Sequence, residues 1–404
     1  MNHPSRNARA LVEIVTVFLK LGCISFGGPV AHLAYLHEEF VRKRRWLDDG
    51  AYGDLVALCQ FLPGPASSQL VYALGMMRGG LPGALLASFC FTLPSALLMI
   101  LFGYGIARAG DLRGAGWLHG LKLAAVAVVA QAVWNMGKKL CPDRTRVALA
   151  LLAAVAVLVV PGAWAQIAVI AAGMAAGWIF CREPKGTRTP GEGNGAIIYP
   201  KYGYICAIGA LVLFALLLLP PLAGGGTVGS GARVFEGFYR AGALVFGGGH
   251  VVLPLLHAEV VPAGLVSDDM FLAGYGAAQA LPGPLFTFAA YLGTVMDGGT
   301  RGWVNGLWCL LAVFLPGWLL IGGALPFWHV LRDKGWMQAA MRGANAAVVG
   351  MLLAALYHPV WTSAAGGLRE AAAALAAFAL LEVWRVPPWC VVLLSALAGW
   401  WLFG

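Results

Sequence analysis

Two short stretches of the sequence interrupt apolar segments with the same Pro-Gly-Pro motif. They are residues 60–69, QFLPGPASSQ, and residues 279–288, QALPGPLFTF. Proline removes a backbone donor and clashes with the preceding turn, so a helix is expected to end at each motif. In lipid, such a break is tolerated only inside protein or beside a wet cavity. Two breaks at matching positions of two chain halves indicate the binding site of a transporter.

The chemistry expected at these breaks is anion binding. The first amides of a helix that restarts after Pro65 have no intrahelical partner and carry the positive end of the helix dipole. Ser67 and Ser68 add two hydroxyl donors there, and Thr287 after Pro284 offers a weaker version. Helix N-termini with such donors favour negatively charged ligands.

Each chain half also places one basic residue inside an apolar segment, Lys20 in the first and Arg240 in the second. A cation inside the membrane is costly and usually functional. Alternatively, each side chain snorkels to an interface or pairs with Glu13 or Glu236, one to two turns away. Both interpretations stay open from the sequence.

Polar residues around the turns complete the candidate set. His250 could carry a proton near neutral pH, although a lone histidine is more often a hydrogen-bonded structural residue. Gln60 and Gln279 could donate to an oxyanion or cap the broken helix, and Lys122, which Asn345 replaces in the second half, is expected to be a helix-end anchor. The candidate substrate-binding residues are Lys20, Phe26, Gly27, Gly28, Gln60, Pro63, Gly64, Pro65, Ala66, Ser67, Ser68, Arg240, Gly247, Gly248, Gly249, Gln279, Pro282, Gly283, Pro284 and Thr287, and the proton-coupling candidates are His250, Glu13 and Glu236.

Composition places the protein in a membrane. Of its 404 residues, 60% are hydrophobic and only 11% are charged, which excludes a soluble globular domain and predicts an all-α polytopic membrane protein. The net charge of +9 indicates basic cytoplasmic loops rather than nucleic-acid binding. The eight cysteines form no C-x-x-C pair, and His32, His37 and Glu38 lack zinc-site spacing, so we expect no metal, no cofactor and an interface position for these three residues. No apolar segment carries an acidic pair or a nucleophile with a nearby base, so the sequence does not predict an enzyme.

The two halves are copies of one unit of roughly 180 residues. Phe26-Gly27-Gly28 matches Phe246-Gly247-Gly248 at an offset of 220, as Lys20 matches Arg240. Gln60 matches Gln279 at 219, and Gly120 matches Gly343 at 223. We therefore expect an N-terminal repeat at 1–181, a cytoplasmic linker with a connecting helix at 182–230, and a C-terminal repeat at 231–404.

The charge distribution predicts how the repeats sit in the membrane. Apolar runs predict nine crossings, near 80–106, 117–136, 145–160, 163–181, 202–221, 303–329, 337–357, 368–384 and 387–403. Four interrupted segments remain, at 10–40, 50–77, 231–257 and 268–293, and re-entrant hairpins put more Lys and Arg in the cytoplasm than full spans do. Five crossings then separate the two pairs of hairpins, so the repeats should have inverted topology.

These motifs together resemble the chromate transporter (CHR) family, in its long, two-domain form. The resemblance rests on the Phe-Gly-Gly and Pro-Gly-Pro motifs of both halves and covers nearly the whole chain. It implies an inner-membrane protein that exports chromate by using the proton gradient and so confers chromate resistance. Sulfate or another oxyanion as substrate, an anion channel instead of a transporter, and assembly as a homodimer stay open alternatives.

Overall fold

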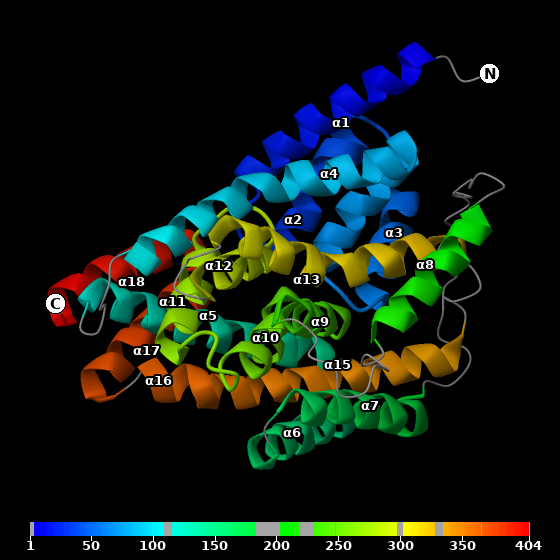
Figure 1. Ribbon diagram of the computed structural model, residues 1–404. Coiled ribbons are helices and arrows are strands. Elements are labelled where there is room, and N and C mark those ends of the chain that lie inside the picture. Colours follow the sequence, from blue (N-terminus) through cyan, green and yellow to red (C-terminus); the bar gives the residue numbers. More distant parts are fainter. Residues whose placement is uncertain are drawn as a thin grey trace.

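The computed structural model describes residues 4–108, 115–160, 162–182, 203–218, 230–246, 248–296, 302–327, 334–364 and 366–403. Every regular element within these ranges is a helix, which confirms the all-α class (Figure 1). The first half contains α1 (Pro4–Ile24), α2 (Gly28–His37), η1 (Glu38–Lys43), α3 (Asp49–Phe61), α4 (Ala66–Arg108), α5 (Gly116–Leu140), α6 (Arg144–Val159) and α7 (Ala163–Phe180). After α8 (Gly203–Leu218), the second half contains α9 (Ser230–Ala243), η2 (Gly249–Val251), α10 (Val252–Val260), α11 (Asp268–Gln279), η3 (Leu285–Thr287), α12 (Phe288–Val295), α13 (Gly302–Ala324), η5 (Leu325–Phe327), α15 (Gly335–Ala355), η6 (Leu356–Trp361), α16 (Thr362–Ala364), α17 (Leu368–Glu382) and α18 (Pro388–Phe403).

Four of the described helices are long and apolar enough to cross a membrane: Ala66–Arg108, Gly116–Leu140, Gly302–Phe327 and Gly335–Ala364. They coincide with four of the nine predicted crossings. The other five fall on α6, α7, α8, α17 and α18, which have 15 to 18 residues. A straight span needs about 20 residues, so crossings by these five helices stay predictions.

The helices break where the motifs predicted. Between α3 and α4 the chain turns at Gly64, with φ +120°, and after α11 it turns at Gly283, with φ +93°. Gly27 and Gly28 between α1 and α2 also have positive φ, at +96° and +75°. L-residues with side chains rarely adopt these conformations, which explains the glycines at these turns.

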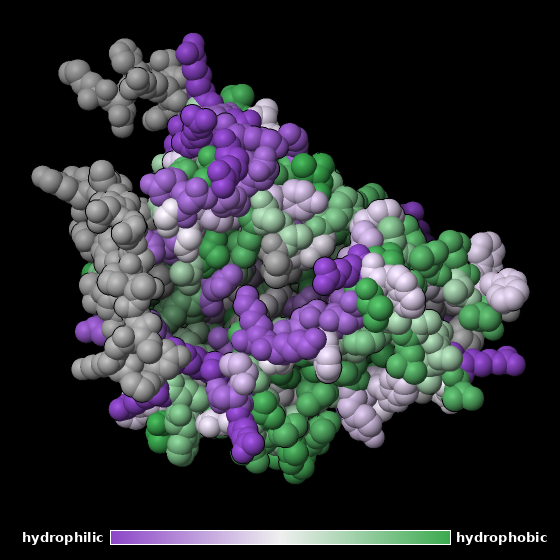
Figure 2. Space-filling view, turned by 180° about the vertical axis from the view of Figure 1, so that it is seen from behind, coloured by the Kyte–Doolittle hydropathy of each residue, from purple (hydrophilic) through white to green (hydrophobic). Residues whose placement is uncertain are grey.

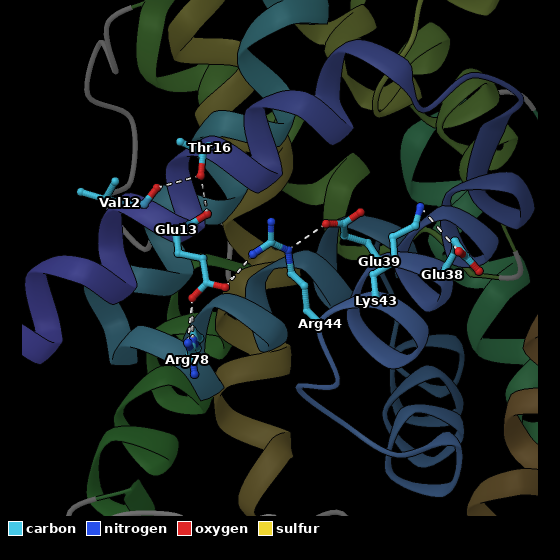
Figure 3. Close-up of polar contacts among 8 residues, drawn as sticks. All are labelled: Val12, Glu13, Thr16, Glu38, Glu39, Lys43, Arg44 and Arg78. Carbon is cyan, nitrogen blue, oxygen red and sulfur yellow. Dashed lines mark hydrogen bonds and ion pairs between the residues drawn. The ribbon is translucent and has the colours of Figure 1, made fainter.

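Both interrupted segments of the first repeat return to the end from which they start. Glu13, near the start of α1, accepts hydrogen bonds from Arg44, which follows α2, at 2.6 Å and from Arg78 at 2.7 Å (Figure 3). His37 lies 2.8 Å from Asp49 at the start of α3. Beyond Arg78, the backbone leaves helical geometry at Gly79 and Gly80, so that α4 folds back on itself. The first repeat therefore follows the two hairpin paths that the charges predicted.

The second repeat has the same pair of hairpins. Arg240 in α9 donates to Glu259 near the end of α10 at 3.0 Å. The Tyr291 hydroxyl in α12 donates to the carbonyl of Met270, near the start of α11, at 2.8 Å. Both helix pairs thus fold back across their central breaks, with Arg240 in the last turn of α9 in contact with the far part of α10.

The breaks of the two repeats meet through two equivalent hydrogen bonds. The Gly64 amide donates to the Val245 carbonyl at 2.7 Å, and the Gly283 amide donates to the Ser25 carbonyl at 2.8 Å. Ser25 corresponds to Val245 and Gly64 to Gly283 under the repeat offsets. When residue i contacts j′ and i′ contacts j, the two units are related by a two-fold axis. The four breaks therefore form one centre of pseudo-two-fold symmetry.

Equivalent long helices run in opposite directions. Near the end of α4, Tyr104 accepts the Trp303 amide at the start of α13, at 2.9 Å. Later in α13, the Trp318 ring stacks 6.2 Å from Tyr72, before the bend in α4. Residues 81–108 of α4 are therefore antiparallel to α13, their counterpart in the second repeat, as inverted topology requires.

The repeats also exchange their last helices. In the first repeat α5 packs against α17 and α18, and in the second α15 packs against α6 and α7. Glycines make both contacts close: Gly120 meets the Gly399 region of α18, and Gly343 meets Gly177 of α7. Such small residues let membrane helices approach closely.

The exterior is apolar, as a lipid-facing surface requires. Large hydrophobic side chains such as Phe89 of α4, at 57% exposure, and Trp400 of α18, at 68%, point outward. Figure 2 shows hydrophobic residues over much of the surface, and hydrophilic ones both across the middle of this face and near the N-terminal end of the molecule. The exposed residues Arg42–Arg45 lie at that end.

Enlarging the glycines at the exchanged contacts should destabilise the protein. A leucine at position 120 or 343 would drive its Cβ into the backbone of Ser395 or Gly173. We expect Gly120→Leu and Gly343→Leu each to lose about 2 kcal/mol or more, since overpacking alone costs about 1–3 kcal/mol. Thermal unfolding of the purified protein in detergent measures this loss. Gly105→Ala, whose Cβ would meet open space, serves as control.

Inverted topology predicts opposite accessibility of two equivalent loops. Arg42 and Ala263 are both exposed and lie after the first hairpin of their respective repeats. On a cysteine-depleted background, a membrane-impermeant thiol reagent added to intact cells should modify Ala263→Cys but not Arg42→Cys. Equal labelling of the two positions would refute the inversion.

Candidate functional site

The first break gathers polar side chains in the interior. Ser67, Ser68 and Gln69 open the restarted helix α4 and are 4%, 3% and 0% exposed. Gln69 donates from Nε2 to the Pro63 carbonyl at 2.8 Å, which holds the turn closed. Because α4 begins at Ala66, the amides of its first residues have no intrahelical acceptors. The first break thus combines free backbone donors with two hydroxyls.

His32 joins this group from α2. Its ring is 1% exposed, with Nε2 3.0 Å from the Ser25 carbonyl and Nδ1 3.4 Å from the Ser67 hydroxyl. A carbonyl only accepts, so Nε2 carries a hydrogen, and in a neutral ring Nδ1 then accepts from Ser67. The predicted interface position is wrong for His32, because α2 turns it inward against α4. His37, by contrast, is partly exposed and bonded to Asp49.

Three buried polar atoms around this break have no hydrogen-bond partner within the described residues. They are Ser25 Oγ, Ser68 Oγ and Gln69 Oε1. Leaving a buried polar group unsatisfied costs about 1–3 kcal/mol, so native proteins keep few of them. The two hydroxyls can donate to a ligand that accepts hydrogen bonds, together with the free amides of the helix N-terminus, whereas Gln69 Oε1 can only accept.

The second break is filled by apolar side chains. Leu285, Phe286 and Phe288 are at most 7% exposed, and the Thr287 hydroxyl donates to the Pro284 carbonyl at 2.8 Å. The first break therefore carries more polar side chains than the second, and anion binding there stays a prediction.

His250, which follows the glycine turn of the second repeat, is hydrogen-bonded to a residue of the same repeat. His250 Nδ1 lies 2.8 Å from the Tyr275 hydroxyl. Gly248 has φ +155°, Gly249 begins η2, and Gly247 lies outside the described residues. The proton-coupling role of His250 stays a prediction.

The two intramembrane cations differ in their surroundings. Lys20 is exposed on α1 and makes no ion pair within the described residues. Arg240 is held by Glu236 at 2.8 Å and by Glu259 at 3.0 Å, with its guanidinium 5.3 Å from the Trp164 ring centroid. The sequence missed Glu259, which is 19 residues away across the hairpin. Substrate binding by either cation stays a prediction.

The remaining candidates lie around the breaks. Gln60 is exposed, whereas Pro65, Pro282 and Pro284 are buried. The Phe26 ring lies 6.3 Å from Trp389, and Gln279 Nε2 is buried without a partner in the described part of the chain. Glu13 is shared by two arginines, not bonded to Lys20. Lys122 binds Asp269 of α11 at 2.9 Å and so links the two repeats. Within the described ranges, no three acidic, His or Cys side chains are grouped to hold a metal.

A buried polar break, antiparallel repeats and an apolar exterior define a membrane transport protein built from two inverted repeats. The chain belongs to the chromate transporter family, whose model matches residues 12–178 and 232–400. The family matches both repeats.

Curated relatives resemble the chain over most of its length. A chromate transport protein of Cupriavidus metallidurans is 29% identical over 86% of this chain and 82% of its own length. A chromate transport protein of Pseudomonas aeruginosa is 28% identical, over 97% and 92%. An uncharacterized transporter of Methanocaldococcus jannaschii is 24% identical, over 86% and 84%. No solved structure matches the chain.

Removing the Arg240 charge should destabilise the second repeat. Arg240→Gln would leave two carboxylates facing each other in a site where Arg240 and Glu259 are 13% and 15% exposed. We expect a loss of roughly 3 kcal/mol, because breaking a buried ion pair strands its partner. Thermal unfolding in detergent measures it, and adding Glu259→Gln to the variant should restore part of the stability. An Arg240→Gln protein as stable as wild type would contradict this assignment.

Proposed function

We propose that this protein exports chromate from the cytoplasm across the inner membrane, driven by the proton motive force, and thereby confers chromate resistance. The family and the named relatives support chromate as the substrate. The unpaired donors of the first break carry the proposal, because they offer an oxyanion several hydrogen bonds in a buried place.

The geometry of the first break suits a tetrahedral dianion. The amides of Ala66, Ser67 and Ser68 lie in the first turn of α4, at the positive end of its dipole, and the Ser68 and Ser25 hydroxyls have no partner within the described residues. Hydrogen bonds from such donors to a charged acceptor are stronger than neutral ones. Outward movement is electrically favourable, since each charge gains about 2.3 kcal/mol per 100 mV across an interior-negative membrane.

Burial favours a transporter over an open channel. The side chains of Ser67, Ser68 and Gln69 are at most 4% exposed, so the polar groups of the first break are not open to solvent. An occluded central site between two inverted repeats is typical of alternating access. Sulfate has the same shape and charge as chromate, so it is the nearest alternative substrate.

Loss of one site hydroxyl should slow transport. A hydrogen bond to a charged group contributes about 1.5–3 kcal/mol, so Ser68→Ala should lower chromate uptake at limiting substrate by about tenfold or more. Proteoliposomes with imposed voltage and pH gradients provide the measurement, and Thr145→Ala, an exposed position at the start of α6, is the control. Uptake that follows the voltage but is indifferent to the pH gradient would support a channel. Excess sulfate that fails to inhibit would argue against a shared site.

A further inference from the structure

We propose that His32 takes up a proton when the anion binds, so that one proton and one anion occupy the first break together. This inference rests on the proposed function, because it concerns the same anion site. It assigns the coupling proton to a residue of α2 instead of to His250, Glu13 or Glu236.

The charge balance of the first break calls for such a group. Its donors are amides and hydroxyls, all of them neutral. Lys20 faces outward from α1, and Arg240 already neutralises carboxylates in the other repeat. A dianion taken out of water without a compensating charge is strongly disfavoured. A titratable side chain beside the anion could supply that charge.

His32 is placed to respond to the anion alone. It faces the Ser25 carbonyl from α1, and the Ser67 hydroxyl and the Phe91 ring edge, 5.6 Å away, from α4. These contacts, made within the described residues, are all uncharged. A dianion bound beside the ring would therefore favour the imidazolium over the neutral ring.

The hydrogen bonds transmit the effect of this proton from the His32 ring to the anion through Ser67. In the neutral ring, Nε2–H donates to Ser25 and Nδ1 accepts the Ser67 hydroxyl hydrogen. A proton from solvent bound at Nδ1 turns this nitrogen into a donor, so the Ser67 oxygen accepts from it. The Ser67 hydrogen must then turn away from the ring and can donate to the anion. Protonation thus adds both a charge and a hydrogen-bond donor.

The second repeat lacks this arrangement. Val252 stands where the first repeat has His32, and Phe286 stands where it has Ser67. The protein therefore has one proton-linked anion site among its two breaks, which sets the expected ratio at one proton per anion. A proton and a dianion that leave together carry one net negative charge outward, so the electrical part of the proton motive force drives this export while the pH gradient opposes it.

Calorimetry tests the inference directly. Chromate is titrated into the purified full-length protein at mildly alkaline pH in two buffers of different ionisation enthalpy. Wild type should take up about one proton per anion bound, and sulfate, which stays a dianion, should give the same count if it binds. His32→Gln should bind more weakly without proton uptake, whereas the exposed-site control His358→Gln should match wild type.

The outcomes separate the two proposals. Absence of any chromate or sulfate binding contradicts the proposed function. Binding of wild type without proton uptake, uptake that persists in His32→Gln, or uptake lost in His250→Gln instead would overturn the inference alone. If His32→Gln does not fold, Ser67→Ala decides. Wild-type affinity for chromate should rise about tenfold for each unit of pH decrease, as linkage of one proton requires. Ser67→Ala should weaken this pH dependence. A pH dependence equal to that of wild type would contradict the role of Ser67.

Discussion

The structure depends on one pair of backbone hydrogen bonds, from Gly64 to Val245 and from Gly283 to Ser25. Each bond joins a broken turn of one repeat to a broken turn of the other. In an apolar interior, a freed amide must find a protein partner, and here each repeat supplies what the other lacks. This exchange allows four helix breaks to persist side by side and fixes the two-fold relation of the halves.

The two breaks differ in polarity although their backbones are related by pseudo-two-fold symmetry. Symmetry of the backbone places Ser67 and Phe286 at equivalent points, yet one is polar and hydrogen-bonded to His32, while the other packs among aromatic rings. The first break keeps the unpaired hydroxyls of Ser25 and Ser68, whereas apolar side chains fill the second, where Gln279 Nε2 is the unpaired donor among the described residues. Sequence divergence between the copies has therefore concentrated polar chemistry on one side of a shared scaffold.

Much of this organisation was predictable, because proline and glycine act locally. The breaks follow from the loss of a donor at Pro63 and Pro65 and from the positive φ at Gly64 and Gly283. Partners across a hairpin were not predictable in the same way. His32 looked like an interface residue, since nothing in α2 reveals that it faces Ser67, 35 residues on. The ion pair between Arg240 and Glu259 was not predicted for the same reason.

The exchange of terminal helices has a consequence for biosynthesis. The face of α5 that carries Gly120 is covered by α18, the last helix of the chain. The N-terminal half must therefore keep this face uncovered in the bilayer until α18 has been synthesised. Its final packing is a late event, set by the insertion of α18 and not by the order in which its own helices are inserted.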